Sequence, residues 1–531
     1  MNADVVISGG GPTGLLLAAE LRLGGARVVV LERRAEPDPV PRANGLVGQV
    51  VTVLYRRGLY RALARHDRGP RALVQRWFTG SLGDRPRPVR GFSHAGFRLD
   101  LRRLRDANPL HVLAVPQRRM EQVFERHARG LGADVRRGHT FAGLAQDGDG
   151  VTVEVDGPDG RYRLRAAYLV GCDGSHSAVR KVAGIGFPGE TSREVVIRMA
   201  HVVLPRAALT PAGALRAADG AVYRPYQLHR TAHGAFSFAS FIPGVHVLST
   251  HEWDAQAPGE QVPMSVAEAR TSLSRVVGVD VPVAEPPTDG RPWILRRLTD
   301  RNNRLADPYR VGRVFVVGDA AHVFAGFGGS NLNLGLQDAV NLAWKLALVA
   351  RGLAPDALLD TYQSERMPQA RQALDRTREQ AELMAPGDEV TARRERYAAR
   401  LREPGFLREV ADAVAGLDLP YPMGQGPAPL GRMAPDLRLA HDGRRIRLAS
   451  LQHGARPLLL DLTGGPALAA AAAPWADRVD LVRATSRDPG APPALLIRPD
   501  GYVAWTGPAP NDPTGLPDAL TTWFGPPATT P

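Results

Sequence analysis

The chain has 531 residues, of which 44% are hydrophobic, and it carries a formal net charge of +13. This length favours two large domains and a smaller one over a single domain. The basic residues are dispersed and, apart from Lys181 and Lys345, all of them are arginine. The charge therefore indicates a compositional bias, and it argues against a nucleic-acid-binding protein, in which basic residues gather in a run or patch.

The sequence also lacks the marks of membrane and secreted proteins. No apolar run reaches the ~18–20 residues of a transmembrane helix, and the N-terminus enters an expected strand without the basic region of a secretory signal. Cys172 is the only cysteine, so neither an internal disulfide nor a cysteine metal site can form, and we expect no metal. We expect a cytoplasmic protein, either a monomer or a homodimer.

The first motif with a chemical meaning is GGGPTG, which begins at Gly9 and matches G-x-G-x-x-G. It follows the short apolar strand DVVIS and precedes a helical stretch and a second strand that ends at Glu32. In such a motif Gly9 permits a tight turn, Gly11 lets the backbone approach a pyrophosphate, and Gly14 lets helix and strand pack closely. Because Glu32 lies where a carboxylate can accept hydrogen bonds from a ribose diol, the pattern predicts a dinucleotide site.

Three arginines follow this unit: Arg33, Arg34, and Arg42 just before a helical stretch that runs to about His66. Arg42 has two interpretations, a solvated surface arginine or a phosphate contact. Residues 68–111 are rich in Arg, Pro and Gly, and we expect them to leave the first domain. They include two strand-like patches, Ala72–Phe78 and Gly96–Leu101.

Regular structure resumes with a short strand and a helix that begins at Gln117. A β-hairpin follows, and then a second strand–turn–helix unit. In that unit Asp173 marks the turn, and Ser175 or Ser177 is expected to cap the helix that carries Arg180. The predicted strands of the hairpin are Gly150–Asp156 and Arg161–Ala166.

From about residue 186 to residue 300 the pattern is that of an antiparallel sheet inserted between two parts of the nucleotide domain. Its aromatic side chains have two interpretations, core residues or a flat apolar wall for an aromatic ligand. The predicted helix is Ser265–Val277. The predicted strands are Val195–Val203, Ala221–Leu228, Ala235–Phe241, Val245–Trp253 and Trp293–Leu298.

A second ligand-binding signal runs from Gly318 to Leu346, after an apolar strand at Val314–Val317. It places Asp319, His322, glycines and asparagines between a strand end and a long helix. Strand ends that lead into helix N-termini are where α/β proteins bind anionic or dinucleotide ligands. Two such signals, far apart and without a second fingerprint, suggest one ligand held from two sides.

The rest of the chain is predicted to be helical and then to form a small α/β domain. Two long helices, about Leu332–Gly352 and Pro355–Leu383, lead to a Pro- and Gly-rich linker at Leu417–Pro435. The strand-rich segment beyond the linker contains no cysteine, so this domain cannot perform dithiol chemistry. We expect it to serve packing or oligomerisation.

Three motifs together identify a family. The stretches GGGPTGLLLAAEL with Glu32, GCDGSHSAVR, and GDAAH followed by GGSNLNLGLQDAVNLAWKL resemble the FAD-dependent aromatic hydroxylases of the p-hydroxybenzoate hydroxylase class. The larger members, such as aromatic polyketide hydroxylases and phenol hydroxylases, look most similar. The resemblance spans nearly the whole chain and implies an α/β fold. This fold is a Rossmann-like FAD-binding domain with an inserted antiparallel β-sheet substrate domain and a C-terminal thioredoxin-like domain.

The resemblance also implies domain limits and cofactor contacts. The FAD-binding domain would comprise residues 1–72, 112–185 and 301–385, the substrate domain 73–111 and 186–300, the helical segment and linker 386–435, and the thioredoxin-like domain 436–531. FAD would be the cofactor, with NADPH or NADH as a transient co-substrate. The implied FAD contacts are Gly11, Pro12 and Thr13 at the pyrophosphate, Glu32 at the ribose, and Arg33, Arg42, Gln117, Asp173, Asp319, Leu332 and Asn333.

The implied reaction inserts one oxygen atom from O2 into an aromatic, polyketide or phenolic, substrate through a flavin C4a-hydroperoxide, as part of secondary metabolism. The oxygen chemistry belongs to the flavin, and no acid–base triad is visible or needed. We therefore assign no catalytic residue. His322, Gly326 and Asn331 are candidates for the flavin face, and a structural role is favoured for His322.

Two departures from the family pattern leave the outcome of the reaction open. The family commonly has Pro-Pro where this chain has Ala325 and Gly326, and Gln-Gly where it has Ser330 and Asn331. The first change loosens a segment over the flavin, because proline fixes φ and glycine does not. The alternatives are epoxidation, Baeyer–Villiger oxidation, or a flavin-binding scaffold with impaired oxygen activation.

Overall fold

In the computed structural model, the part of the chain that is described comprises residues 3–40, 43–65, 75, 83–253, 256–325 and 330–528. Its largest sheet joins segments that are far apart in the sequence and has the order β20-β21-β10-β1-β2-β7. The strands from β21 to β7 run parallel, and β20 is antiparallel to β21. Their bounds are β1 Ala3–Ser8, β2 Val28–Glu32, β7 Asp134–Arg137, β10 Gly160–Gly171, β20 Arg310–Val311 and β21 Val314–Val316.

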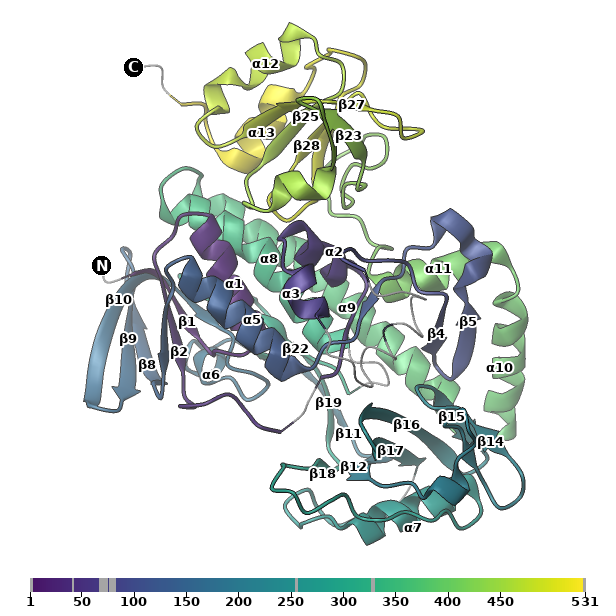
Figure 1. The fold of residues 1–531 in the computed structure, drawn as a ribbon. Helices are drawn as coiled ribbons and strands as arrows, with labels where there is room; N and C mark the ends of the chain where they lie inside the picture. The colour runs from purple at the N-terminus through teal and green to yellow at the C-terminus, as the bar shows by residue number, and fades with distance from the viewer. Residues whose placement is uncertain are drawn as a thin grey trace.

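The two faces of this sheet are covered differently. One face packs on three helices, α1 (Pro12–Leu23), α5 (Gln117–Gly130) and α8 (Ser330–Ala350), which lie together beside the sheet in Figure 1. The other face packs against β8 (Thr140–Gln146) and β9 (Val151–Gly157), which continue antiparallel from β10. The central strands are therefore buried on both faces, and their nearly continuous Val, Ile and Leu runs follow from this.

The predicted hairpin, the helix that begins at Gln117 and the cap at Ser177 are confirmed. The single helical stretch to about His66 is wrong. The chain forms α2 (Gln49–Arg56) and then α3 (Tyr60–Ala64), because Gly58 adopts a φ of 71° and breaks the helix between them. The predicted patch at Ala72–Phe78 and Arg42 lie outside the described residues.

The inserted sheet is antiparallel, with the order β15-β16-β17-β12-β18, and α7 (Val266–Val277) covers one face. Phe236 and Phe238 lie in the core beneath α7, so for these two side chains the core interpretation is correct. The strand predicted at Ala221–Leu228 is wrong over most of its length. Only β14 (Val222–Tyr223) forms within it, because Pro225 has no N–H to donate and Tyr226 adopts a φ of 62°. The strands are β12 Val195–Val202, β15 Leu228–Thr231, β16 Gly234–Ile242, β17 Val245–Trp253 and β18 Leu295–Leu298.

Short strands and four further helices link these two sheets. The hairpin β4–β5 packs against α11, and α9 and α10 run beside it (Figure 1). The helices are α6 Ala178–Val182, α9 Asp360–Met384, α10 Asp388–Arg400 and α11 Pro404–Ala415. The strands are β3 Leu46–Val47, β4 Gly91–His94, β5 Phe97–Asp100, β6 Val112–Leu113, β11 Gly189–Ser192, β13 Leu215–Arg216, β14 Val222–Tyr223, β19 Arg301–Leu305 and β22 His322–Val323.

The C-terminal part, at the top of Figure 1, forms a separate sheet with the order β26-β25-β28-β29. Helix α13 packs in a core that also holds Trp344 and Leu348 of α8, so this part is docked on the nucleotide fold. The predicted α/β class is confirmed. The bounds are β23 Arg438–His441, β24 Arg444–Arg447, β25 Leu458–Asp461, α12 Pro466–Ala472, β26 Asp480–Arg483, β27 Thr485–Ser486, β28 Ala494–Ile497, β29 Val503–Thr506 and α13 Leu516–Phe524.

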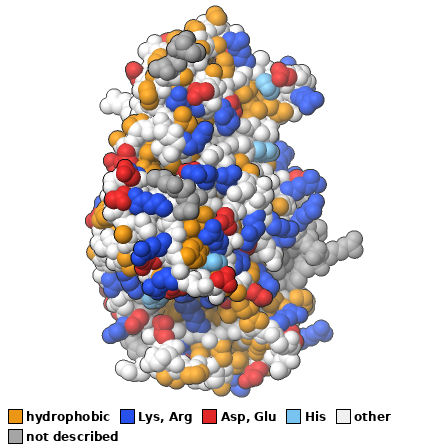
Figure 2. Space-filling view, turned by 90° about the vertical axis from the view of Figure 1, so that its left-hand side faces the viewer, with side chains coloured by type: hydrophobic (Ala, Val, Ile, Leu, Met, Phe, Trp, Pro, Cys, Tyr) orange, Lys and Arg blue, Asp and Glu red, His pale blue; other side chains and the backbone are white. Residues whose placement is uncertain are grey.

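The surface has no one-sided charge on the face shown in Figure 2, where basic side chains are interspersed with acidic and hydrophobic ones. Many arginines on the exterior pair with a nearby acid, as Arg161 does with Asp156 at 2.7 Å. Among the helices that the structure describes, none has both the length and the apolar composition needed to cross a lipid bilayer.

Candidate functional site

The turn after β1 is built by glycines with different tasks. Gly9 has a φ of 111°, and a Cβ there would overlap the backbone carbonyl of Cys172. A Cβ at Gly14 would overlap the carbonyl of Gly9, so α1 can approach β1 only with glycine at this position. A Cβ at Gly11 would meet no protein atom within 4 Å. Gly9 and Gly14 therefore serve the fold, while Gly11 faces open space at the N-terminus of α1.

Glu32 holds this turn from the end of β2. Its two carboxylate oxygens accept hydrogen bonds from the backbone N–H of Gly10 at 2.7 Å and of Arg34 at 2.9 Å. An ionised carboxylate has about four lone-pair sites, so acceptor capacity remains for a ligand diol. Arg33 is exposed beside it, and Gln117, at the start of α5, donates to Glu121 at 2.9 Å.

The second signal meets the first at the N-termini of α1 and α8. Gly318, with a φ of 64°, opens a single 3-10 turn (Gly318–Ala320) directly after β21. A Cβ at Gly335 of α8 would lie 2.9 Å from the Cα of Gly318 and 3.2 Å from Oγ1 of Thr13. Asp319 is exposed in the turn. Residues from opposite ends of the nucleotide fold thus converge where two helix N-termini favour negative charge.

The GCDGSHSAVR motif joins the same region. Oδ2 of Asp173 accepts from the backbone N–H groups of Ala178 at 2.8 Å and Val179 at 3.1 Å, which caps α6. Arg180 is buried and donates to the carbonyl of Ala320 at 3.0 Å. Its guanidinium lies 3.7 Å from the ring centre of Phe187, and burial lowers its pKa. Arg180 therefore ties α6 to the 3-10 turn that carries Asp319.

His322 is completely buried, and its hydrogen-bond partner is another buried side chain. Its Nε2 lies 2.6 Å from Oδ2 of Asp338, and Oδ1 of Asp338 accepts from Nε of Arg366 at 2.7 Å. Burial alone would raise the pKa of Asp338, but Arg366 and His322 lower it further than burial raises it. Asp338 is thus ionised and can only accept, so His322 Nε2 carries the proton. This arrangement supports the structural role favoured for His322.

Asp338 and Arg366 were missed by the sequence reasoning. Asp338 lies in the apolar helix that contains LQDAVNLAWKL, and Arg366 lies in the polar segment YQSERMPQA. The available signal was an acid on the buried face of an apolar helix, since such a group requires a partner. The sequence could not name Arg366 as that partner, because the two residues lie on different helices.

The first turn of α8 holds the other predicted residues. Oδ1 of Asn333 accepts from the backbone N–H of Val47 at 2.9 Å, which ties this turn to β3, and Leu332 is partly buried beside it. Asn331 donates from Nδ2 to the carbonyl of Phe324 at 3.2 Å. Gly326 lies outside the described residues, so its expected place at the flavin face stays a prediction.

The region fits a dinucleotide in three respects. It offers open space at Gly11, two converging helix N-termini, and buried acceptors that still require donors. Oδ1 of Asp173 and Oδ1 of Asn331 are buried, and neither has a hydrogen-bond partner among the described residues. Phosphates match the helix N-termini, and hydroxyl or imide N–H groups match such acceptors. These features fit the chemistry of FAD.

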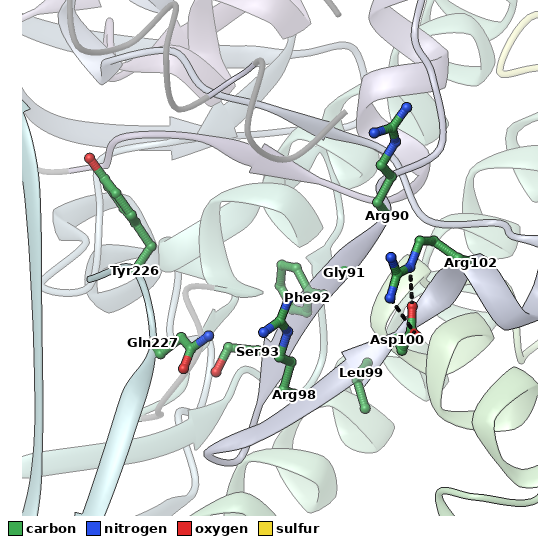
Figure 3. Close-up of a pocket in the computed structure, with 10 residues that line it drawn as sticks. All are labelled: Arg90, Gly91, Phe92, Ser93, Arg98, Leu99, Asp100, Arg102, Tyr226 and Gln227. Carbon is green, nitrogen blue, oxygen red and sulfur yellow. Dashed lines mark hydrogen bonds and ion pairs between the residues drawn. The ribbon is translucent and has the colours of Figure 1, made fainter. Parts of the chain in front are cut away.

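A separate pocket of about 170 Å3 lies between the hairpin β4–β5 and the loop that precedes β15 (Figure 3). We call it the hairpin pocket. Figure 3 shows Arg102 bound to Asp100 through two contacts, of 2.7 and 2.9 Å, which neutralise its charge. Arg90 and Arg98 are exposed, and neither forms an ion pair with another residue that the structure describes. The lining residues are Arg90, Gly91, Phe92, Ser93, Arg98, Leu99, Asp100, Arg102, Tyr226 and Gln227.

Comparisons with known proteins agree with this geometry. A family model described as "FAD binding domain" matches residues 2–377, and one described as "Aromatic-ring hydroxylase, C-terminal" matches residues 428–527. A 12-dehydrotetracycline 5-monooxygenase/anhydrotetracycline 6-monooxygenase of Streptomyces rimosus is 41% identical over 538 residues, covering 99% of this chain and 100% of the relative. A rifampicin monooxygenase of Streptomyces venezuelae is 38% identical over 523 residues and covers 98% of both chains.

A solved structure gives the same result. CabE, an aromatic hydroxylase from angucycline biosynthesis, superposes with a TM-score of 0.84 and 34% identity over 99% of this chain and 100% of its own. The resemblance in the sequence is therefore confirmed for the family, the fold and the use of FAD. The chain belongs to the FAD-dependent aromatic-ring hydroxylases.

Proposed function

We propose that this monooxygenase hydroxylates a polycyclic phenol of the aromatic polyketide type, with NADPH or NADH as reductant. The observation that carries the proposal is the meeting of Thr13, Gly318 and Gly335 at two helix N-termini, in a chain related to monooxygenases over its full length. The names of three relatives refer to tetracycline, rifampicin and angucycline compounds, and these names motivate the choice of a polycyclic substrate.

We further propose how the chain holds FAD. Gly11, Pro12 and Thr13 would hold the pyrophosphate, because a Cβ at Gly11 would meet no protein atom within 4 Å and the turn is therefore open there. Glu32 would accept from the adenosine ribose. The further proposed contacts are Arg33, Arg42, Gln117, Asp173, Asp319, Leu332 and Asn333.

When it is bound, FAD supplies the reduction by NAD(P)H and the transfer of one oxygen atom from O2. The chain's own residues then have three tasks. The N-terminus of α8 favours negative charge on the reduced cofactor near Leu332 and Asn333. The Asp338–His322 pair fixes the turn at Gly318, since Asp338 also lies 3.4 Å from the backbone N of Gly318. The inserted sheet would exclude water from the bound substrate.

We further propose that the hairpin pocket binds the acidic group of such a substrate. Arg90 and Arg98 line this pocket together with Ser93, Gln227 and Phe92. Phenols and enols of fused-ring polyketides are acidic, and guanidinium groups bind their anions by charge-assisted hydrogen bonds. Replacing both arginines with alanine should raise KM for such a substrate about tenfold while kcat changes little, because 1.4 kcal/mol of ground-state binding corresponds to tenfold.

The test is oxygen incorporation by the FAD-loaded enzyme. Polycyclic phenols of three and four fused rings are incubated with the enzyme, NADPH or NADH, and 18O2, and products are analysed by mass spectrometry and NMR. The proposal requires a new C–OH group that carries one 18O atom. A ring-expanded lactone or an epoxide would instead establish Baeyer–Villiger oxidation or epoxidation, and hydrogen peroxide as the sole product would establish the scaffold alternative.

A further inference from the structure

Two residues on the way from β22 to α8 are held by side chains instead of by a sheet. Strand β22 pairs with β19 through Val323 opposite Arg304 and His322 opposite Leu305, and the pairing ends there. Phe324 and Ala325 follow, and both belong to the segment that leads from the buried His322 to the first turn of α8. The backbone groups of Phe324 and Ala325 therefore need partners other than a neighbouring strand.

Three side chains supply these partners. Oδ1 of Asn303 accepts from the backbone N–H of Ala325 at 2.9 Å, and the guanidinium of Arg301 donates to the carbonyl of Ala325. From the first turn of α8, Nδ2 of Asn331 donates to the carbonyl of Phe324 at 3.2 Å. Arg301 and Asn303 are buried, with exposed fractions of 7% and 8%. We call Arg301, Asn303 and Asn331 the backbone clamp.

The position of the clamp on β19 follows from strand alternation. Arg301 and Asn303 point to one face, towards Ala325, while Asn302 and Arg304 point to the other face. There Oδ1 of Asn302 accepts from Thr191 at 2.8 Å, and Arg304 donates to the same threonine at 3.0 Å. The strand thus carries an Asn and an Arg on each face, and only one pair holds Ala325.

We infer that the backbone clamp is a positioning device that fixes the segment Phe324–Ala325 against the cofactor side of the site. Alanine leaves φ free and brings an N–H group that proline would lack. That N–H donates to Oδ1 of the buried Asn303, and this hydrogen bond fixes the peptide. The ring of Phe324, stacked on His322 with 5.4 Å between ring centres and 3° between ring planes, is fixed with it.

For its catalytic consequence, the inference rests on the proposed function. In the productive reaction, substrate–H, O2, NADPH and a proton yield substrate–OH, NADP+ and water. In the uncoupled reaction, O2, NADPH and a proton yield hydrogen peroxide and NADP+. A fixed wall that excludes water favours the first reaction. Loosening the clamp should therefore shift NADPH consumption towards hydrogen peroxide without slowing the NADPH-dependent reduction step.

Asn303→Ala is the direct test, with Asn302→Ala as the matched control on the other face of β19. Hydrogen–deuterium exchange of the peptide that contains Ala325 is measured on the full chain, with and without FAD. Asn303→Ala should speed exchange about tenfold, the factor that corresponds to one lost hydrogen bond, and should raise the hydrogen peroxide fraction severalfold. Asn302→Ala should change neither, and Asn303→Asp, which keeps an acceptor oxygen, should exchange like the unmodified protein.

Three results would overturn the inference: exchange unchanged by Asn303→Ala, equal acceleration by Asn302→Ala, or acceleration by Asn303→Asp as large as that by alanine. A thermal unfolding scan identifies general unfolding, in which peptides far from the clamp would exchange faster as well. The exchange readout does not depend on a substrate. If no aromatic compound is hydroxylated, the proposed function fails while the clamp is still tested.

Discussion

Helix α9 carries two adjacent residues that enter different buried charge clusters. Arg366 belongs to the cofactor-side cluster, which we define as His322, Asp338 and Arg366. Glu365 belongs to the domain-side cluster, which we define as Lys345, Glu365, Arg498 and Asp500. The first joins the turn after β21 to α8 and α9, and the second joins these helices to the C-terminal domain.

The two clusters differ in how their charges are balanced. In the cofactor-side cluster a single carboxylate, Asp338, holds both partners, so its loss would leave Arg366 without an anion. In the domain-side cluster Arg498 binds Glu365 at 2.6 and 2.8 Å and also binds Asp500, while Lys345 binds Glu365 at 2.8 Å. A buried charge that loses its partner strongly destabilises the folded protein. The cofactor-side cluster therefore depends on one anion, Asp338. In the domain-side cluster two carboxylates, Glu365 and Asp500, balance the positive charges of Lys345 and Arg498.

The largest effect is therefore expected from Asp338→Ala. This change leaves Arg366 buried without its anion, which should lower the free energy of unfolding by about 3–5 kcal/mol. Because Asp338 also lies near the N–H of Gly318, the fraction of purified protein that retains FAD should fall as well. Urea denaturation and the flavin absorbance of the purified variant measure the two effects. A loss below about 1 kcal/mol would mean that Asp338 is not the residue on which this cluster depends.

Lowering the pH should destabilise the folded protein through the domain-side cluster. Burial alone would raise the pKa of Glu365, but Arg498 and Lys345 lower it to about 2, from an ordinary 4.5. A lowered pKa in the folded state means that stability is fully present above pH 4.5 and is lost as the pH falls towards 2. The loss should reach about 3 kcal/mol at most. Unfolding curves between pH 6 and pH 2.5 measure it. In Glu365→Gln this part of the pH dependence should disappear, and a slope equal to that of the unmodified protein would contradict the assignment.

A smaller effect is expected at Tyr421, which touches both clusters. Its hydroxyl accepts from Arg366 at 3.0 Å, while the guanidinium of Arg498 lies 5.3 Å from its ring centre. Tyr421→Phe removes the contacts of the hydroxyl, keeps the ring, and should lower the free energy of unfolding by about 1 kcal/mol. Its ring also stacks on Tyr502 at 4.0 Å, so Tyr421→Ala should be clearly more destabilising than Tyr421→Phe. Equal losses would place the whole contribution in the hydroxyl.

The sequence could predict the features that depend on neighbouring residues, and it could not predict contacts between segments that are far apart in the chain. The turn at Gly9–Gly14, the β9–β10 hairpin and α5 depend on local geometry and on alternation along the chain, so motif and periodicity were sufficient. The break at Gly58 was missed because a single glycine does not by itself distinguish a helix interior from a helix end. The Asp338–Arg366 pair joins two helices, and neither strand pattern nor motif spacing carries such pairings.

The backbone clamp shows the same limit. The sequence indicated that Ala325 lacks the rigidity of proline and that Asn331 places a side chain where glycine is common. It did not show that Asn331 and Asn303 restrain that same segment. Their contacts depend on how β19 passes the segment after β22, which is set by the tertiary fold. The departures from the family pattern are thus connected through Phe324 and Ala325, and their effects on rigidity oppose each other.

The central claim is that FAD binds at the turn where Gly11 faces open space, and one titration tests it most directly. FAD-free Gly11→Ala is compared with the unmodified protein in urea unfolding and in FAD titration followed by flavin fluorescence. A Cβ at this position meets no protein atom within 4 Å. The free energy of unfolding of the FAD-free protein should therefore stay within about 1 kcal/mol, while the Kd for FAD should rise at least about tenfold. An unchanged Kd at unchanged stability would contradict the assignment of this turn to the cofactor.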